Sequence, residues 1–416
     1  MKKYKINKKY IKNRNLKKHK HNIKRKNKKY VRGKKIPLNS FNRKVPYEID
    51  LWNSIKIEKR NETFVFPKIF SLTSNPKETL YFIKKIASCY RKKQDLDIKL
   101  DCKNTIEFDI SSLIILSSII VKGSKYIHGF GYKHKISGNF PYEEKCKEIF
   151  INSGLPKHLN IFKNDEINNI ELLEPFSTIK HTTKETMRII NYYNSCLRRN
   201  GLMLNDKGKD YFFDLINEIV DNAIIHGQHG KTVYSGGYYN QREHKGQLSI
   251  ISYGNSMYES LNSKDTSIEV KDTIEHFSKM HNKYFDDNYD EESLWTLLAI
   301  QYKISRLKNK TNDRGTGTIK FIETFMKMGN TLGTEKPVMS ITSGNTTIVF
   351  DGKYKIEEKD YKGSLVKQIA FNKENNLEKC PDKCYVKNNN VKFPGVAINI
   401  EFYIDKEYLK QYKEEN

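Results

Sequence analysis

Glu218 and Asn222 are the two residues whose types and spacing point most directly to chemistry. They bound the segment Glu218-Ile219-Val220-Asp221-Asn222, and a spacing of four places both on one face of a helix. The amide oxygen of Asn222 can ligate a magnesium ion that bridges phosphates, because Mg²⁺ prefers oxygen ligands and takes few from protein. The carboxylate of Glu218 can orient or deprotonate a water molecule. The pair predicts a magnesium–phosphate site, although the same spacing also occurs on solvated helix faces.

Two glycine-bearing segments further along the chain could hold phosphates. The first is Ser252-Tyr253-Gly254-Asn255-Ser256, and the second contains Arg314, Gly315, Thr316, Gly317 and Thr318. Glycines let backbone N–H groups approach a phosphate, and the helix expected directly after the second segment adds a favourable dipole. Arg314, with Lys308 and Lys310 before it, could reach the β- and γ-phosphates.

Apolar periodicity predicts the elements that must position these residues. A helix is expected from Asp206, a suitable N-cap, to Gly227, a suitable stop, and another from Ile319 to Met328. The expected strands are Thr232–Tyr239, Gln247–Tyr253, Val338–Ser343, Thr346–Asp351 and Val396–Ile404. Gly344-Asn345 is a strong turn signal, which predicts a hairpin between the third and fourth of them. The alternation in the last strand predicts one buried face.

The stretch Asn217–Gly227 (NEIVDNAIIHG) resembles the N box of the GHKL superfamily, and the two glycine segments follow in that superfamily's order. Its members include gyrase, mismatch-repair ATPases, sensor histidine kinases and anti-sigma-factor kinases. The resemblance implies an α/β sandwich over 206–416, a mixed sheet with helices on one face. It also implies a nucleotide lid at about 257–313 and a surface insertion at about 352–395.

The resemblance implies ATP and Mg²⁺ as cofactors. Glu218 would be the catalytic base and Asn222 the magnesium ligand. The residues expected around the nucleotide are Ser252, Gly254, Arg314, Gly315, Thr316, Gly317 and Thr318. Whether ATP is hydrolysed, transferred or only bound stays open.

The chain departs from the superfamily in its first glycine segment. Ser252 stands where an Asp normally binds the adenine amino group, and Ser256 replaces a glycine. A hydroxyl meets a purine edge less decisively than a carboxylate, so base selectivity stays open. Asp221 is no substitute, since it points away from Glu218 and Asn222 on the helix. His226 either helps close the pocket or favours the helix dipole at its end.

Residues 47–160 predict a smaller α/β domain, in which strands alternate with helices. The expected elements are helix Ser74–Lys93, strands Asp97–Cys102 and Thr105–Asp109, helix Ser111–Val121, a possible strand Lys125–Gly131, and helix Tyr142–Asn152 ending at Gly154. This order resembles a STAS domain over roughly 75 residues. Ser111 and Ser112 lie near the position that accepts a phosphate in some members, but the surrounding sequence does not match, and capping of the helix is expected instead.

Residues 161–205 predict a linker with one helix, Lys184–Arg198. His181 precedes that helix, where a sensor kinase would carry its phosphoacceptor. The residues around it, His-Thr-Thr-Lys-Glu, lack the expected acidic neighbour and proline. A histidine kinase is therefore rejected.

The net charge of +26 lies mostly in the first 46 residues, which contain twenty Lys or Arg and no Asp or Glu. So few apolar side chains predict a disordered tail. Its charge could bind nucleic acid or another polyanion without reading a sequence. A solubilising tail, or contact with an acidic protein or a membrane surface, stays open.

Composition excludes some classes of protein. No run of about 18 apolar residues predicts a membrane span, and no apolar stretch follows the basic N-terminus as in a secretory signal. Six scattered cysteines predict a reducing cytoplasm rather than a disulfide framework, and Cys380 and Cys384 lack a second pair for zinc.

Two hypotheses of function follow. The first is an ATP-binding regulator whose Mg-nucleotide-dependent lid controls a protein partner, with a serine kinase of anti-sigma type as a variant. The second is a degenerate GHKL scaffold that binds nucleic acid or protein through its basic tail. The replacements at Ser252 and Ser256 favour the second.

Overall fold

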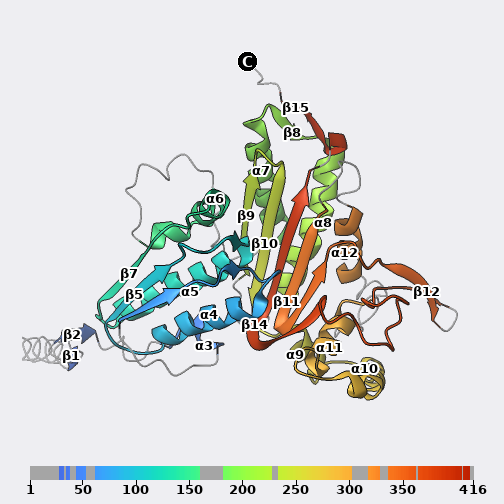
Figure 1. Cartoon of the computed structure of the whole chain (residues 1–416), viewed down its shortest axis with the longest axis horizontal. Helices are drawn as coiled ribbons and strands as arrows, with labels where there is room; N and C mark the ends of the chain where they lie inside the picture. Colours follow the sequence, from blue (N-terminus) through green and yellow to red (C-terminus); the bar gives the residue numbers. More distant parts are fainter. Residues whose placement is uncertain are drawn as a thin grey trace, which may run out of the picture.

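The chain folds as a mixed α/β protein with several sheets (Figure 1). The computed structural model describes residues 28–31, 34–37, 44–52, 61–159, 181–226, 233–301, 317–327, 336–361, 364–404 and 406–412. Within these ranges, helices and sheets alternate as four stacked layers, which the following paragraphs describe from the central sheet outward.

The central sheet has four strands in the order β11-β14-β10-β9. They are β9 (Val233–Asn240), β10 (Lys245–Tyr253), β11 (Val338–Phe350) and β14 (Val386–Tyr403). Every pairing among them is antiparallel, so the expectation of a mixed sheet is wrong for the described strands. The short turn between β9 and β10 reverses the chain and requires antiparallel pairing there.

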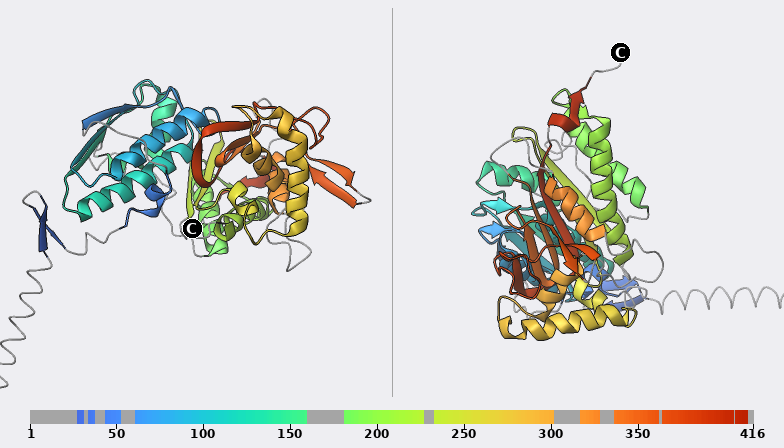
Figure 2. Two further views of the ribbon diagram at one scale, coloured as in Figure 1. Left: turned by 90° about the horizontal axis from the view of Figure 1, so that it is seen from below. Right: turned by 90° about the vertical axis from the view of Figure 1, so that its right-hand side faces the viewer.

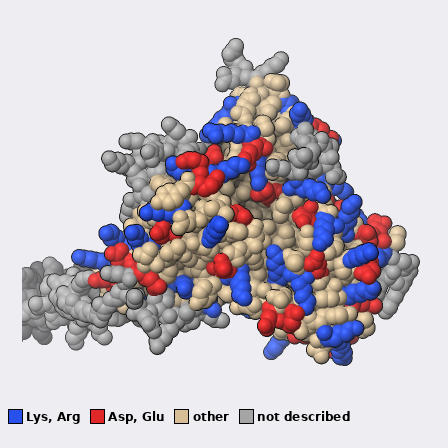
Figure 3. Space-filling view, in the orientation of Figure 1, with Lys and Arg blue, Asp and Glu red and all other residues tan. Residues whose placement is uncertain are grey.

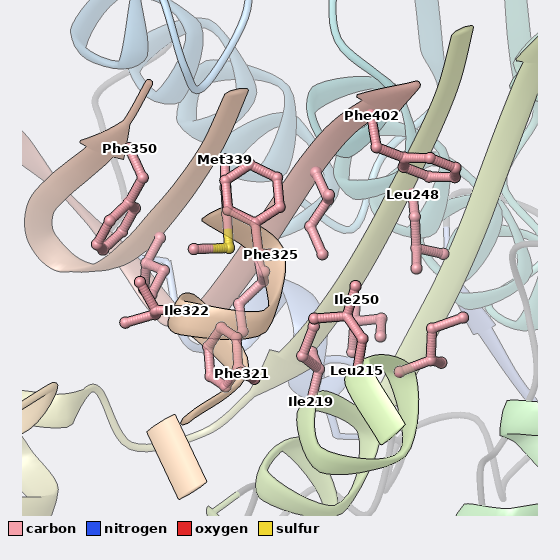
Figure 4. Close-up of a cluster of buried hydrophobic side chains, with 14 of the residues drawn as sticks. Leu215, Ile219, Leu248, Ile250, Phe321, Ile322, Phe325, Met339, Phe350 and Phe402 are labelled. Carbon is pink, nitrogen blue, oxygen red and sulfur yellow. The ribbon is translucent and has the colours of Figure 1, made fainter. Parts of the chain in front are cut away.

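Three helices cover one face of this sheet, which we call the inner face. They are α7 (Thr182–Arg198), α8 (Asp206–His226) and α12 (Gly317–Lys327). Their apolar side chains meet inward-facing residues of the strands in one buried cluster (Figure 4). The residues labelled there are Leu215, Ile219, Leu248, Ile250, Phe321, Ile322, Phe325, Met339, Phe350 and Phe402. The periodicity that predicted α8 therefore reflects its packing on the sheet.

The outer face of the sheet is also covered, by α4 (Pro76–Tyr90) and α5 (Ile110–Gly129) (Figures 1 and 2). Tyr234, Ile251 and Tyr253 share one core with these helices. Within 206–416, helices α8 and α12 lie on the inner face, and the helices on the outer face come from 47–160. Both faces are covered because alternate residues of the strands are apolar enough to be buried on both sides.

Beyond α4 and α5 lies a three-stranded parallel sheet of β3 (Asn61–Val65), β5 (Leu96–Asp101) and β7 (His134–Gly138), in the order β3-β5-β7. A second parallel pair joins β4 (Ile69–Phe70) to β6 (Glu107–Phe108). Residues 47–160 thus contribute parallel strands and helices, and those helices share one core with the central sheet. With α4 and α5 between two sheets, α5 is buried on most of its surface.

A row of buried polar side chains joins the two halves of the molecule. Ser249, Asn399 and Ser340 lie side by side on β10, β14 and β11. The Ser111 hydroxyl donates to Asn399 Oδ1 at 3.0 Å, and its oxygen lies 2.7 Å from Ser249 Oγ. The Thr73 hydroxyl lies 2.8 Å from Ser340 Oγ and accepts from Asn399 Nδ2 at 3.2 Å. Satisfied buried polar groups of this kind fix one relative position of the layers.

Ser111 and Ser112 do not cap α5, contrary to expectation. Asp109 is the N-cap, and its carboxylate accepts from the Ser112 N–H at 2.7 Å. Both serines are fully buried, and the Ser112 hydroxyl donates to the Phe70 carbonyl at 2.9 Å. Asp109, directly before the helix, caps its unpaired N–H groups. The hydroxyls of Ser111 and Ser112 can therefore make tertiary contacts instead.

Helix α5 continues through 125–129, so the possible strand Lys125–Gly131 is wrong. Tyr126 and Ile127 extend the buried face of the helix, and their short apolar run fits either structure until packing decides. α5 is also the one described helix with the length and composition of a membrane span, but it is mostly buried inside the molecule. α6 (Glu144–Asn152) ends before Gly154, which has a φ of +73°, as expected.

The lid region contains three helices, α9 (Met257–Leu261), α10 (Ile268–His281) and α11 (Glu291–Ala299), with the 3-10 turn η2 (Asn282–Tyr284). They pack on the inner core through Leu261, Ile274 and Leu298. His281 is fully buried, and its ring bonds Tyr289 Oη at 2.9 Å and the Leu377 carbonyl at 2.8 Å. This part of the lid is thus a packed helical unit, and 302–313 lie outside the described residues.

The predicted hairpin at Gly344-Asn345 is wrong. β11 is one continuous strand paired with β14, and its register shifts at Gly344, which has a φ of +58°. A glycine with positive φ fits a bulge as well as a turn. Pairing with the long strand β14 on both sides of Gly344 selects the bulge. The predicted insertion 352–395 is also partly wrong, since Ile369 and Phe371 are buried and β14 begins at Val386.

The remaining elements are short. They are β1 (Lys28–Val31), β2 (Lys34–Pro37), α3 (Tyr47–Asp50), η1 (Leu155–His158), β8 (Leu202–Leu204), β12 (Glu357–Tyr361), β13 (Ser364–Gln368), η3 (Lys406–Tyr408) and β15 (Leu409–Gln411). β1 and β2 pair within the tail that was expected to be disordered. The rest of the tail before residue 44, and residues 161–180 of the expected linker, lie outside the described residues.

Candidate functional site

The helix that carries the candidate site forms close to where the sequence predicts it, over Asp206–His226. Asn205 rather than Asp206 caps its start, because the Asn205 side chain accepts from the Gly208 N–H at 2.8 Å. Phe212, Ile216 and Val220 are buried along its inner side. That burial fixes the rotation of the helix, which leaves Glu218 and Asn222 half-buried on a neighbouring side.

Glu218 and Asn222 contact each other directly. Asn222 Nδ2 donates to Glu218 Oε1 at 3.1 Å. Because the amide nitrogen makes this bond, the amide oxygen is the atom that can face a metal ion. An amide oxygen beside a carboxylate is a donor set that suits Mg²⁺, which also needs ligands from phosphate and water.

Gly317, the first residue of α12, packs against the Glu218 carboxylate. A Cβ placed on Gly317 would overlap Glu218 Oε1 and lie 2.7 Å from Glu218 Cδ. With the carboxylate in this position, a residue with a side chain fits at 317 only if Glu218 shifts. Two of the segments that the sequence assigned to one site, the acid–amide helix and the second glycine segment, meet at this contact.

Burial raises the pKa of Glu218. The hydrogen bond from Asn222 opposes that rise, Asp221 adds to it, and Lys320 on α12 lowers the pKa. A carboxyl group whose pKa is raised holds a proton more readily, which suits a general base that must also release it. Lys320 was not singled out from the sequence, although it lies three residues after Gly317, one helical turn into α12.

The opposite side of α8 is structural. Thr182 on α7 donates to Asp221 Oδ1 at 3.1 Å, and Thr186 donates to Asn217 Oδ1 at 3.4 Å. Asp221 is thus bonded to α7, but it lies three residues after Glu218, close enough for its charge to raise the pKa of that carboxyl group. The expectation that Asp221 points away from Glu218 is therefore wrong, whereas Asn217 serves the contact with α7.

Ser252 and Gly254 lie at the end of β10. Ser252 is buried and its hydroxyl donates to the Val396 carbonyl at 3.5 Å. It shares the inner side of the sheet with Leu248 and Ile250, whereas Tyr253 points outward and bonds Ser118 on α5 at 2.9 Å. Gly254 has a φ of +148°, a conformation that favours glycine whether or not a phosphate is bound.

Ser256, which stands where the GHKL superfamily has a glycine, has a structural role. Its hydroxyl accepts from the Glu259 N–H at 3.1 Å, and its own N–H donates to Glu259 Oε2 at 2.9 Å. This reciprocal pair is a capping box that starts α9. The serine therefore stabilises the first helix of the lid.

Several expected site residues lie outside the described residues: Lys308, Lys310, Arg314, Gly315 and Thr316. Thr318 is described as the second residue of α12 and is half-buried. His226 is the last residue of α8, but its side chain is outside the described set. His181 is exposed at the start of α7 and makes no side-chain capping bond there.

A second contact between α8 and α12 was not predicted from the sequence. The Tyr211 hydroxyl donates to the Thr324 carbonyl, and the Tyr211 ring stacks on Tyr408 with centroids 5.0 Å apart. No local pattern signals such a bond, because its partners lie on different helices. Together with Gly317, it holds α12 against α8 at two points.

Comparison with known proteins gave no assignment: no protein-family model, no curated protein and no solved structure matches the chain.

Proposed function

We propose that this chain is an ATP-binding regulatory protein of the GHKL type, with Mg-ATP bound between α8 and the start of α12. The observation that carries the proposal is the contact of Glu218 with Gly317. These residues lie about 100 positions apart, and the sequence pattern assigns both to one nucleotide site. A helix start beside an acid–amide pair offers N–H donors for phosphate and an oxygen ligand for magnesium.

Each residue has one role in this proposal. Asn222 Oδ1 holds Mg²⁺, which offsets phosphate charge when bound. Glu218 accepts a proton from the attacking water if hydrolysis occurs. The first turn of α12, at Gly317 and Thr318, offers N–H groups to the phosphates. Ser252 and Gly254 are assigned to the base and sugar end, with base selectivity open.

The regulatory part of the proposal concerns the lid. Its helices α9 to α11 precede α12 in the chain, and residues 302–316 connect α11 to Gly317. A nucleotide at the start of α12 would therefore act on this connection and change how the lid contacts a protein partner. The six cysteines are free thiols, which fits the cytoplasm that the proposal assumes.

The serine-kinase variant is open only for a substrate outside this chain's own α/β layer. Ser111 and Ser112 are fully buried at the outer face of the sheet. Glu218 lies on a helix at the inner face. Both hydroxyls are therefore separated from the proposed site by the sheet itself.

Equilibrium binding of ATP with Mg²⁺ and with a chelator tests the class. Asn222→Ala removes the metal ligand, so its affinity for Mg-ATP should fall on the order of tenfold or more. The matched control is Asn217→Ala, on the same helix but turned toward α7. No ATP binding by the parent protein, or equal affinity for Asn222→Ala and the parent, would exclude the proposed site.

Hydrolysis needs its own measurement. In single-turnover reactions with Mg-ATP, Glu218→Ala should slow any hydrolysis on the order of 100-fold, because a positioned base contributes about that much. If the parent protein binds ATP without turnover, the function is nucleotide-dependent binding alone. If Glu218→Ala hydrolyses ATP at the parental rate, Glu218 is not the base.

A second candidate, polyanion binding, rests on the charge of the tail. Twenty Lys or Arg lie in residues 1–46 without one acidic residue. On the face of the body in Figure 3, by contrast, basic and acidic side chains are interspersed. Deleting 1–46 should abolish binding to duplex DNA and its salt dependence, since counterion release scales with the phosphates neutralised. Unchanged affinity and salt slope would exclude this role.

A further inference from the structure

Two tyrosine rings form a corner at the end of the central sheet where β11 stops and β14 starts. Tyr354 follows β11, and Tyr385 directly precedes β14. The centres of the two rings lie 5.1 Å apart, and their planes are at 89° to each other. The buried ring of Phe371 packs against both, 5.7 Å from Tyr354 and 6.4 Å from Tyr385. Three aromatic side chains thus build this corner.

Carboxylates hold the two tyrosine rings in place. The Tyr354 hydroxyl donates to Asp382 Oδ2 at 2.9 Å, and the Tyr385 hydroxyl donates to Asp351 Oδ2 at 2.6 Å. Asp382 is fixed in turn, because its Oδ1 accepts from the Cys384 N–H at 2.9 Å. The faces of aromatic rings attract cations, and carboxylates strengthen hydrogen bonds from them. The corner is therefore built to hold a positively charged group.

A cation does occupy the corner, and it is the ammonium group of the chain's own Lys353. Lys353 Nζ lies 5.0 Å from the centre of the Tyr354 ring and 4.7 Å from that of Tyr385. It also donates to Asp382 Oδ2 at 2.9 Å, and this bond raises the pKa of Lys353. The Lys353 side chain is nonetheless 51% exposed, so it can leave the corner without disturbing the core.

Two features distinguish this corner from an ordinary surface contact. Lys85 lies over the Tyr81 ring at 4.8 Å, a contact of one lysine with one ring that is common in proteins. At Lys353, two perpendicular rings and a carboxylate act on one ammonium group. In addition, Phe371 has a φ of +54°, which bulky residues rarely adopt, and such backbone strain is concentrated at functional sites. The Phe371 carbonyl accepts from the Asp382 N–H at 2.7 Å, which ties this backbone to the corner.

We propose that Tyr354, Tyr385 and Asp382 form a binding site for the ammonium group of a lysine side chain from another protein, with Lys353 as its intramolecular competitor. The group seated there defines the chemistry of the ligand. Its bond to Asp382 requires an N–H donor, which a quaternary ammonium lacks. An incoming lysine takes the place of the Lys353 ammonium group, which turns into solvent. This site is separate from the proposed ATP site and does not depend on it.

The variant Lys353→Ala tests the competition, because it removes the occupant and keeps both rings and Asp382. Its affinity for n-butylammonium, a mimic of the lysine side chain, should exceed that of the parent protein on the order of tenfold, since a tethered competitor acts at a millimolar or higher effective concentration. Tetramethylammonium should bind Lys353→Ala several-fold more weakly, because it has no N–H for Asp382. Saturation-transfer NMR titrations of the full chain with each salt measure these affinities.

Lys85→Ala is the matched control, because it removes a lysine from a single tyrosine ring. It should bind n-butylammonium as the parent does. In the Lys353→Ala background, Tyr385→Leu removes one wall of the corner and should abolish the gain in affinity. Thermal unfolding checks that each variant is folded. Asp382→Asn, which removes the charge and keeps the shape, replaces Tyr385→Leu if that variant does not fold.

The outcomes are decisive for the site and for its ligand. Equal affinity of Lys353→Ala and the parent for n-butylammonium overturns the proposal, as does a gain that survives Tyr385→Leu or appears equally in Lys85→Ala. Equal binding of tetramethylammonium and n-butylammonium overturns the requirement for an N–H, and with it lysine as the ligand. Nα-acetyl-lysine methylamide should bind Lys353→Ala at least as tightly as n-butylammonium. Much weaker binding would identify the ligand as a free alkylamine instead of a protein side chain.

Discussion

Two carboxylates in the part of the chain that the structure describes lie against glycines, and their surroundings differ. Glu218 on α8 lies against Gly317 at the start of α12, and Glu292 on α11 lies against Gly344 in the bulge of β11. In both places a Cβ on the glycine would overlap a carboxylate oxygen. Burial raises the pKa of both carboxyl groups. Similar local geometry therefore occurs once at the candidate site and once in the lid.

The partners of the two carboxylates separate their roles. Glu292 Oε1 accepts the backbone N–H of Asn345 at 3.1 Å, and the Asn345 side chain donates to Asp290 at 2.7 Å. This arrangement clamps the bulge to the start of α11. Glu218 is instead bonded by a side chain, that of Asn222. A backbone bond ties a carboxylate to the fold, whereas a side-chain bond leaves it free to exchange partners.

The glycines differ as well. Gly344 has a φ of +58°, which a residue with a Cβ rarely adopts, and a Cβ there would also lie 3.2 Å from Ser256 Cβ. Gly317 is an ordinary helical residue whose added Cβ would meet only Glu218 within 4 Å among its nearest atoms. At Gly344 the backbone itself requires glycine. At Gly317 the requirement comes from one neighbouring side chain.

The largest effect should follow Gly344→Ala. The left-handed conformation and the overlap with Glu292 together should cost on the order of 3 kcal/mol of unfolding free energy. Urea unfolding measures it. Adding Glu292→Ala should recover only part of the loss, since the strained φ remains. Full recovery of the unfolding free energy in the double variant would show that glycine is required at 344, as at 317, only because of the neighbouring carboxylate.

Gly317→Ala should cost less, about 1 kcal/mol, because the added Cβ meets only the far end of the Glu218 side chain, which can shift away from it. Here the second substitution should rescue fully: in a Glu218→Ala background, Gly317→Ala should be neutral or slightly stabilising, because alanine favours helix. The double-mutant cycle gives the coupling directly. A cost that is the same in both backgrounds would mean that Glu218 is not what requires glycine at 317.

The smallest effect concerns pH. The folded pKa of each carboxyl lies above its ordinary value of 4.5, so the ionised form is disfavoured in the folded state. The resulting stability is present below pH 4.5 and is lost as pH rises through the raised pKa. Glu292→Gln should remove that loss and gain less than about 1 kcal/mol at pH 7 after solvent screening.

Glu218→Gln should behave in the same direction, because burial is the largest cause of the raised pKa of both carboxyl groups. Unfolding free energies of the three proteins between pH 4 and 8 test both statements. Parallel pH profiles for the parent protein and Glu292→Gln would contradict the assigned burial of that carboxylate.

Local patterns in the sequence predicted the helix of the candidate site more accurately than the sheet around it. α8 was predicted to within a residue or two because its apolar spacing matches its packing. Strands β9 and β10 also lie close to the predicted ranges Thr232–Tyr239 and Gln247–Tyr253, because a run of strand-forming residues is a local signal. The hairpin predicted at Gly344-Asn345 was wrong because this signal is also local: a glycine with positive φ occurs both in bulges and in hairpin turns.

The sequence by itself determined that Glu218 and Asn222 share a helix face and that a glycine opens α12. Only the tertiary structure decided that Glu218 meets Gly317, that α4 and α5 cover the second face of the sheet, and that Ser111 bonds Ser249 and Asn399. The physical reason is range. Helix faces follow from a period of a few residues, whereas these contacts join residues about 100 to 300 positions apart through packing.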